Sequence, residues 1–269
     1  MRIAIVSNGN AFSTLMLRPL FDEPGLELVG AVLVRVPPGE RGAAGRLMRL
    51  ARRTGLRYAV HKLGSLAIPK SIGALRRRAV FLDELCRARG VPSRSLPSIN
   101  DASAIDLLRR WDPDVLVSVS SPERFVPEVL RVPHVASVNL HWALLPSYAG
   151  IAPYFWVLRN GEPATGLTIH LMVPELDAGD VLVQRRIEIE PRDTSLGLQL
   201  RLTESGAEEL VAALRELPGS LESAAPQDRS GRSYFTWPTP DDVRELRRSG
   251  RKLARASDYL RLGRLLTRR

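Results

Sequence analysis

Asn139 and His141 stand two residues apart at the end of an apolar run, residues 135–141. Residues at this spacing in a β-strand point to the same face of the sheet. Farther along the chain, Asp177 lies in a Gly-containing turn that can return its carboxylate to His141. An amide that stabilises an oxyanion, an imidazole that moves a proton and a carboxylate that orients the imidazole suit acyl transfer. The sequence therefore predicts Asn139, His141 and Asp177 as a catalytic group.

Such a group needs a sheet that holds its members at one edge. Short apolar runs predict strands at 2–6, 27–34, 114–119, 135–141, 167–173 and 181–189. Near-continuous apolar strands that alternate with helices indicate an α/β fold, a mostly parallel sheet covered on both faces. Sites in these folds lie at the carboxyl ends of the strands, which is where Asn139 and His141 are expected.

The segments between and after the strands favour helices. We expect a helix at 101–111 capped by Asn100 or Asp101, and another at 194–217 ended by Pro218 and Gly219. The stretch 41–89 is rich in Leu, Arg and Ala, and it predicts basic helices with Pro69 as a break. Residues 219–239 read as a loop with a possible strand near 233–236, and 240–269 as a basic amphipathic helical tail interrupted at Gly250.

Composition limits the classes of protein and site. Of the 269 residues, 44% are hydrophobic and 25% are charged, which is ordinary for a globular domain. Cys86 is the only cysteine, so we expect no intramolecular disulfide, no cysteine-based zinc site and no metal centre. The sequence shows neither a secretory signal nor about 18 consecutive apolar residues, and we expect a cytoplasmic location.

The formal net charge of +10 is unevenly distributed. Residues 35–95 hold 15 Lys or Arg and 3 Asp or Glu, and residues 229–269 hold 12 and 4. These segments carry +12 and +8, so the rest of the chain carries −10. An anionic partner would therefore meet one or both basic segments, although solvated helix faces are an equally good reading.

The segment around Asn139 and His141 carries further ordered motifs. They are Leu144-Leu145-Pro146, Gly150, Asn160-Gly161-Glu162, Gly166, Thr168, His170 and Leu176-Asp177-Ala178-Gly179-Asp180. In this order and spacing the segment closely resembles the core of the folate-dependent formyltransferases. That family includes enzymes that act on methionyl-tRNA, glycinamide ribonucleotide and sugar nucleotides.

The resemblance implies a Rossmann-like formyltransferase domain over residues 1–217, with the basic helical insertion at about 35–95. Residues 218–269 would be a linker and a short helical appendage. The resemblance also implies that Asn139, His141 and Asp177 are catalytic and that 10-formyltetrahydrofolate is the donor. His170 belongs to the same family pattern, but we expect it to be a packed strand histidine. The loop expected to pack on the pterin includes Ser121, Pro122, Arg124, Phe125 and Val126, together with Leu176 from the Asp177 turn.

Several acceptors fit this family. The aromatic run Pro153-Tyr154-Phe155-Trp156 resembles the sugar formyltransferases, and it favours the amine of a small biosynthetic metabolite such as a nucleotide-linked amino sugar. The region 219–269 looks too loop-rich and too helical for the C-terminal β-barrel of the methionyl-tRNA enzymes. The basic segments keep tRNA, an acidic carrier protein with a bound aminoacyl group, and a membrane-associated amine as alternatives. A formyltetrahydrofolate hydrolase would fit the same catalytic residues, and a non-catalytic binding protein would not need them.

Overall fold

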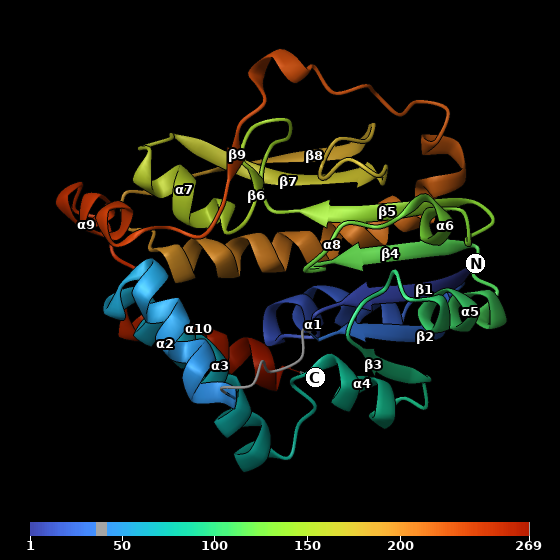
Figure 1. Cartoon of the computed structure of the whole chain (residues 1–269), viewed down its shortest axis with the longest axis horizontal. Helices are drawn as coiled ribbons and strands as arrows, with labels where there is room; N and C mark the ends of the chain where they lie inside the picture. The colour runs from blue at the N-terminus through green and yellow to red at the C-terminus, as the bar shows by residue number, and fades with distance from the viewer. Residues whose placement is uncertain (36–41, 269) are drawn as a thin grey trace.

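A seven-stranded sheet forms the centre of the computed structural model, which describes residues 1–35 and 42–268 (Figure 1). In spatial order the strands are β3 (Ser93–Leu96), β2 (Glu27–Val34), β1 (Arg2–Ser7), β4 (Val115–Val119), β5 (Ala136–His141), β7 (Ala164–Leu171) and β8 (Val181–Glu188). The first five are parallel, and β7 runs antiparallel to both β5 and β8. The predicted α/β class and the six predicted strands are confirmed, and β3 is an additional strand.

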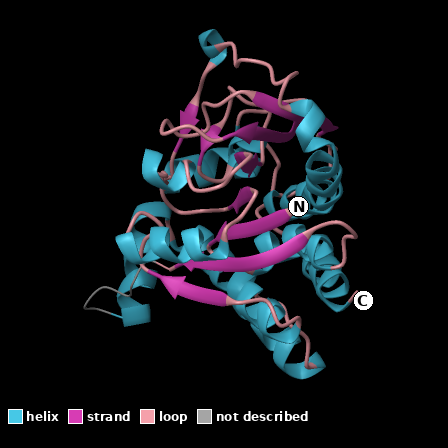
Figure 2. Ribbon diagram, turned by 90° about the vertical axis from the view of Figure 1, so that its right-hand side faces the viewer, coloured by secondary structure: helices cyan, strands magenta, loops and turns pink. Residues whose placement is uncertain are grey.

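Alternate residues of the central strands face two different cores. Ile3 and Ile5 of β1 join a cluster with Met16 of α1 (Ala11–Leu17) and Leu202 of α8 (Ser195–Ser220). Ala4 and Val6 face the other way, toward Leu108 of α5 (Ala102–Trp111) and Val129 of α6 (Pro127–Leu130). Both faces of the sheet are therefore covered by helices, as Figures 1 and 2 show.

Two prolines do not end helices where the sequence predicted. Pro69 lies inside α3 (Leu56–Arg76), and Pro218 lies inside α8. A helical proline removes one backbone hydrogen bond. Pro69 and Leu217 are buried, so packing of these faces outweighs the lost bond. The predicted end of α8 at residue 217 is therefore wrong, and the helix continues to Ser220.

The predicted cap of α5 is also different. Asp101 occupies the N-cap position, but its side chain accepts no capping hydrogen bond. The Asn100 side chain instead bonds to the loop after β4: its Oδ1 accepts from Val126 N at 3.0 Å and its Nδ2 donates to Arg124 O at 2.8 Å. Asn100 thus fixes the loop that the resemblance assigns to folate.

The C-terminal part of the chain contributes one strand to a second, two-stranded sheet. After α8 the chain forms β9 (Tyr234–Phe235), which pairs in parallel with β6 (Ala149–Gly150), and then α9 (Pro240–Arg248) and α10 (Ala256–Thr267). The strand near 233–236 and the interruption at Gly250 are confirmed. The division into 1–217 and 218–269 falls within α8 and stays a prediction.

The basic insertion forms α2 (Gly42–Thr54), α3 and α4 (Leu82–Ala88), and residues 36–41 of it lie outside the described residues. Lys62 of α3 anchors it: Nζ donates to Tyr154 Oη at 2.8 Å and lies 5.5 Å from the centre of the Tyr58 ring. Tyr154 belongs to α7 (Pro153–Arg159), and Trp237, 6.0 Å from Nζ, precedes α9. Cation–π contacts therefore fasten α3 to two other parts of the chain.

We expect His61 to make stability depend on pH. Burial, aided by the charge of Lys62, lowers the pKa of His61 to about 3, whereas an unfolded imidazole titrates near 6.5. Because only the unfolded state binds this proton between those values, stability falls as pH drops below about 6.5. Between pH 7 and pH 5, protonation of this side chain in the unfolded state should lower the free energy of unfolding by about 2 kcal/mol, measured with urea.

The substitution His61→Gln should remove that part of the pH dependence. His134→Gln, at an exposed histidine, is the control and should leave it in place. An unchanged difference between pH 7 and pH 5 in the His61 variant would contradict the assignment.

Candidate active site

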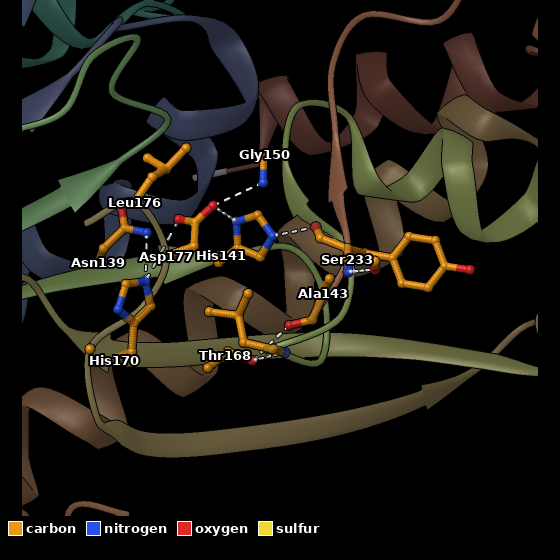
Figure 3. A network of polar contacts seen from close by, with 12 residues as sticks. Asn139, His141, Ala143, Gly150, Thr168, His170, Leu176, Asp177 and Ser233 are labelled. Carbon is orange, nitrogen blue, oxygen red and sulfur yellow. Dashed lines mark hydrogen bonds and ion pairs between the residues drawn. The ribbon is translucent and has the colours of Figure 1, made fainter. Parts of the chain in front are cut away.

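Strands β5 and β7 pair in antiparallel orientation, and this pairing places residues of the candidate site opposite one another. Asn139 pairs with His170, and His141 pairs with Thr168. Asn139 Nδ2 donates to His170 Nε2 at 3.1 Å, and His170 Nδ1 donates to Leu171 O at 2.7 Å (Figure 3). This pattern requires a neutral imidazole protonated at Nδ1. Burial lowers the pKa of His170, which favours that neutral form.

His170 therefore does more than the packed strand histidine that the resemblance implied. It is buried, as expected, and it also fixes which way the Asn139 amide points. One N–H of Asn139 donates to His170, and the residue is only partly buried. Within the described part of the chain its second N–H makes no hydrogen bond.

His141 lies between a backbone carbonyl and a carboxylate. Its Nε2 is 2.9 Å from Tyr148 O, and its Nδ1 is 3.7 Å from Asp177 Oδ2. A carbonyl oxygen can only accept, so Nε2 carries a proton and donates it to Tyr148. The lone pair of the neutral ring then lies on Nδ1, facing Asp177. Protonation at Nδ1 would give an imidazolium beside the carboxylate.

Asp177 reaches this position from the turn predicted at 175–180. Its backbone is left-handed, with φ of 50°, and Oδ2 accepts the Gly150 N–H at 2.9 Å. Asp177 and His141 are both buried, at 8% and 7% exposure. The structure thus brings together all three residues that the sequence predicted as catalytic.

A segment near the C-terminus holds the two loops around His141. We term residues 227–237 the strap. Ala149 N donates to Ser233 O at 2.9 Å, and Ile151 N donates to Phe235 O at 2.8 Å. On the other loop, Arg232 Nη2 donates to Leu176 O at 2.8 Å, and Gln227 Nε2 donates to Asp177 O at 3.2 Å. The strap therefore bonds both the loop of Gly150 and the loop of Asp177.

Aromatic stacking reinforces the strap. The ring of Phe235 stacks on Tyr148 with centroids 5.1 Å apart and on Trp156 at 4.7 Å. Trp156 Nε1 also donates to Thr236 O at 3.0 Å. Tyr148 supplies the carbonyl that orients His141, so this stack supports the imidazole indirectly. The sequence indicated a strand here but gave no sign of its partner.

The predicted folate loop follows β4, beside β5 in the sheet. Phe125 is buried in the core, Val126 packs on that core, and the side chains of Pro122 and Arg124 are exposed. Ser121 Oγ is buried without a hydrogen-bond partner in the described structure. Met172, which follows β7, packs on the same core cluster and links it to the segment that leads to Asp177. Among the described residues, no hydrogen bond or ion pair joins 121–126 to Asn139, His141 or Asp177.

Residues 1–35 and 42–268 lack two further features. No group of three or more His, Cys, Asp or Glu side chains could hold a metal ion. No helix in these ranges is long and apolar enough to cross a membrane.

Comparison with known proteins decides the family. Residues 1–214 match the family model described as formyl transferase. The chain belongs to the formyl transferase family. The methionyl-tRNA formyltransferase of Thermotoga maritima is 38% identical over 153 residues, 57% of this chain and 49% of that relative. The chain thus spans about half the length of this curated relative.

Solved structures share the fold at low identity. Phosphoribosylglycinamide formyltransferase from Bacillus halodurans superposes with a TM-score of 0.58 at 17% identity, covering 81% of this chain and 95% of that one. An N-formyltransferase from Helicobacter canadensis, solved with folinic acid and dTDP-3-aminofucose, gives 0.57 at 12% identity, covering 87% and 70%. Both comparisons confirm the formyltransferase fold.

The substitution Gly150→Ala should loosen the contact between the strap and the site. Gly150 has φ of 97°, and a Cβ there would lie 2.2 Å from Phe235 O. Gly161→Ala is a matched control, because Gly161 has φ of 72° and nothing within 4 Å of an added Cβ. The control should cost only the backbone strain, about 1–2 kcal/mol. Gly150→Ala should cost at least about 2 kcal/mol more, measured by urea unfolding. Equal losses in the two variants would show that the contact with β9 contributes little.

Proposed function

We propose that this chain transfers a formyl group from 10-formyltetrahydrofolate to an amine of a small biosynthetic metabolite, such as a nucleotide-linked amino sugar. The observation that carries the proposal is the connected group at the end of β5, in which the amide of Asn139, the imidazole of His141 and the carboxylate of Asp177 are each held by a hydrogen bond. Membership of the formyl transferase family supports the same chemistry.

Each residue of the group has a distinct role in this proposal. The donor supplies the formyl carbon that the acceptor nitrogen attacks. The free N–H of Asn139 donates to the formyl oxygen as negative charge develops on it. His141 accepts the proton of the attacking amine at Nδ1 and delivers it to the departing folate nitrogen. A new N–C bond forms, the bond from the formyl carbon to the folate nitrogen breaks, and one proton moves between the nitrogens.

Asp177 acts on His141 by charge. Its Oδ2 lies 3.7 Å from His141 Nδ1, a distance that can shorten or hold a bridging water when Nδ1 is protonated. The carboxylate compensates the positive charge that His141 carries once it has taken the proton of the amine. Nε2 cannot take this role, because its proton is committed to Tyr148 O.

The residues after β4 fit a pterin-bearing donor. Ser121 Oγ is buried and unpartnered, so it can bond to a polar edge of the pterin that enters this region. Backbone groups of 121–126 and of Leu176 are the other candidate contacts. We assign Phe125 a packing role beneath the loop, because its ring lies in the core.

The small-molecule acceptor is supported by the C-terminal region. Residues 240–248 and 256–267 are helices, not the β-barrel expected of a methionyl-tRNA enzyme. The dTDP-3-aminofucose named with the Helicobacter canadensis structure is an acceptor of the proposed class.

Methionyl-tRNA is the second candidate acceptor, and the 38% identity to the Thermotoga maritima enzyme favours it. The basic insertion offers positive charge for a phosphate backbone, and it could equally meet an acidic carrier protein. We also propose a cytoplasmic location, where the folate donor is available, and keep 218–269 as an appendage to the catalytic domain.

Substitutions in the catalytic group test the chemistry. His141→Ala should lower kcat by about 100-fold or more with 10-formyltetrahydrofolate and an amino-sugar nucleotide, because proton transfer is lost. Asp177→Asn keeps an oxygen for the Gly150 N–H but removes the charge, and it should lower kcat about tenfold or more. Asp180→Asn, at an exposed position of the same turn, is the control and should leave kcat unchanged. Near-normal kcat in the His141 or Asp177 variant would overturn the assignment.

The acceptor and the hydrolase alternative are resolved in the same assay. The rate of formyl transfer to an amine should exceed the rate at which folate is released when no amine is present. Amino-sugar nucleotides should be formylated faster than methionyl-tRNA. Faster product formation with methionyl-tRNA would favour the second candidate. A rate of folate release that no added amine changes would favour a hydrolase.

Ser121 provides a test of the donor site. Ser121→Val should raise the KM for 10-formyltetrahydrofolate about fivefold or more, because it removes the buried hydroxyl that would bond to the donor. The KM for the acceptor and the unfolding free energy should change little. An unchanged folate KM would contradict the placement of the donor against this loop.

A further inference from the structure

Exposed apolar side chains are concentrated on the basic insertion. Ten large hydrophobic side chains are exposed in the described part of the chain, and seven of these lie on α2, α3 and α10: Met48, Leu56, Val60, Leu63, Leu66, Leu75 and Leu260. Scattered single residues of this kind need no explanation, but a concentration on neighbouring helices marks an interaction surface. Leu56, Val60 and Leu63 follow helical spacing and share one side of α3.

Helices α2 and α3 carry positive charge and no acidic residue. Residues 42–82 hold ten Lys or Arg and no Asp or Glu. Arg52, Arg53, Arg57 and Lys70 are exposed beside the apolar positions. In the part of the chain that the structure describes, no Lys or Arg from 49 to 78 lies within 4.0 Å of a carboxylate oxygen.

Helix α3 presents this surface in a fixed orientation. Its inner side holds Tyr58, His61 and Ser65, all buried, and Lys62 is bonded to Tyr154. The outer side carries Leu56, Arg57, Val60, Leu63, Leu66 and Lys70, which we term the α3 face. Figure 1 shows α3 at the edge of the molecule, on the side toward which β4 and β5 run. Helix α3 and the catalytic edge of the sheet thus lie toward the same side of the molecule.

We propose that the α3 face binds the surface of an anionic lipid bilayer. Its 21 residues give α3 a length of about 31 Å, and the α3 face combines four Leu or Val side chains with Arg57 and Lys70. A helix with this composition lies in the plane of the interface: its apolar side chains enter the headgroup region and its cations meet acidic headgroups. The proposal concerns attachment alone and holds for any of the acceptors discussed above.

Charge and polarity favour a bilayer over a second copy of the chain or a nucleic acid as the partner of the α3 face. A second copy of the chain would bring two acid-free basic surfaces together, and like charges repel. A nucleic acid would satisfy the cations, but it would leave exposed leucine and valine side chains facing phosphates. Acidic lipid supplies both negative charge and an apolar boundary for the same helix.

Vesicle flotation with the full chain tests the proposal. The protein should float with vesicles of equal parts phosphatidylglycerol and phosphatidylcholine, and remain unbound with phosphatidylcholine alone. Raised salt should weaken binding without abolishing it, since the apolar contribution is not screened. Because no formyl transfer is measured, loss of binding and loss of the proposed enzymatic activity are separate results.

Matched pairs of exposed residues locate the surface. Val60→Ser should weaken binding about fivefold, whereas Val135→Ser, at another exposed valine, should not. Arg57→Glu should weaken it about tenfold or more, and Arg110→Glu on α5 should not. Leu63→Trp adds a probe of insertion: its emission, taken as a difference from the parent protein, should shift to the blue on anionic vesicles.

Four results would overturn the proposal. They are absence of flotation with anionic vesicles, equal losses within each matched pair, an unshifted emission of the Leu63→Trp probe, and a stable dimer in sedimentation that Val60→Ser dissociates. If the protein does not float with anionic vesicles but binds tRNA tightly, the surface would instead be assigned to nucleic acid. Binding that is weakened in Val60→Ser and Arg57→Glu and unchanged in the two controls supports the proposal.

Discussion

One hydrogen bond joins the two loops that enclose His141: the Gly150 N–H donates to Asp177 Oδ2 at 2.9 Å. Without it, the carboxylate would be a buried charge with no donor, which costs several kcal/mol. The bond requires Gly150 to lie close to β9, where its φ of 97° and the 2.2 Å clearance for a Cβ admit only glycine. The position of the carboxylate beside the imidazole therefore depends on a strand of the C-terminal region.

The reversal of strand direction at β7 is the second constraint. The parallel order from β3 to β5 ends there, and the antiparallel pair sets His170 opposite Asn139 and Thr168 opposite His141. Each partner then has a defined task. His170 orients the amide, while Thr168 Oγ1 donates to Ala143 O at 2.7 Å and accepts from Leu145 N at 3.0 Å. A parallel β7 would leave neither residue in this relation to the site.

The elements whose structure is determined by the local sequence pattern could be predicted. The strands are runs of apolar and β-branched residues, and the spacing of Asn139 and His141 identified their common face. Asp177 could be linked to them because its turn and the family motif surround it. The strap could not be predicted in full: β6 and β9 are two residues long, and their pairing depends on tertiary packing of Phe235 between Tyr148 and Trp156. Pro69 likewise lies in a helix because burial of its own side chain outweighs its local preference.

The most basic segment of the chain is held in one orientation by the way α3 is attached. An exposed basic helix could turn about its axis, but Lys62 prevents this for α3, since its ammonium needs the Tyr154 hydroxyl and the surrounding rings to offset lost hydration. Tyr154 in turn packs on Trp142, with ring centroids 5.6 Å apart, and Trp142 follows His141 directly. Helix α3 is thus joined to the catalytic strand through three side chains. Any partner that meets the outer side of α3 consequently meets the enzyme in one orientation relative to His141.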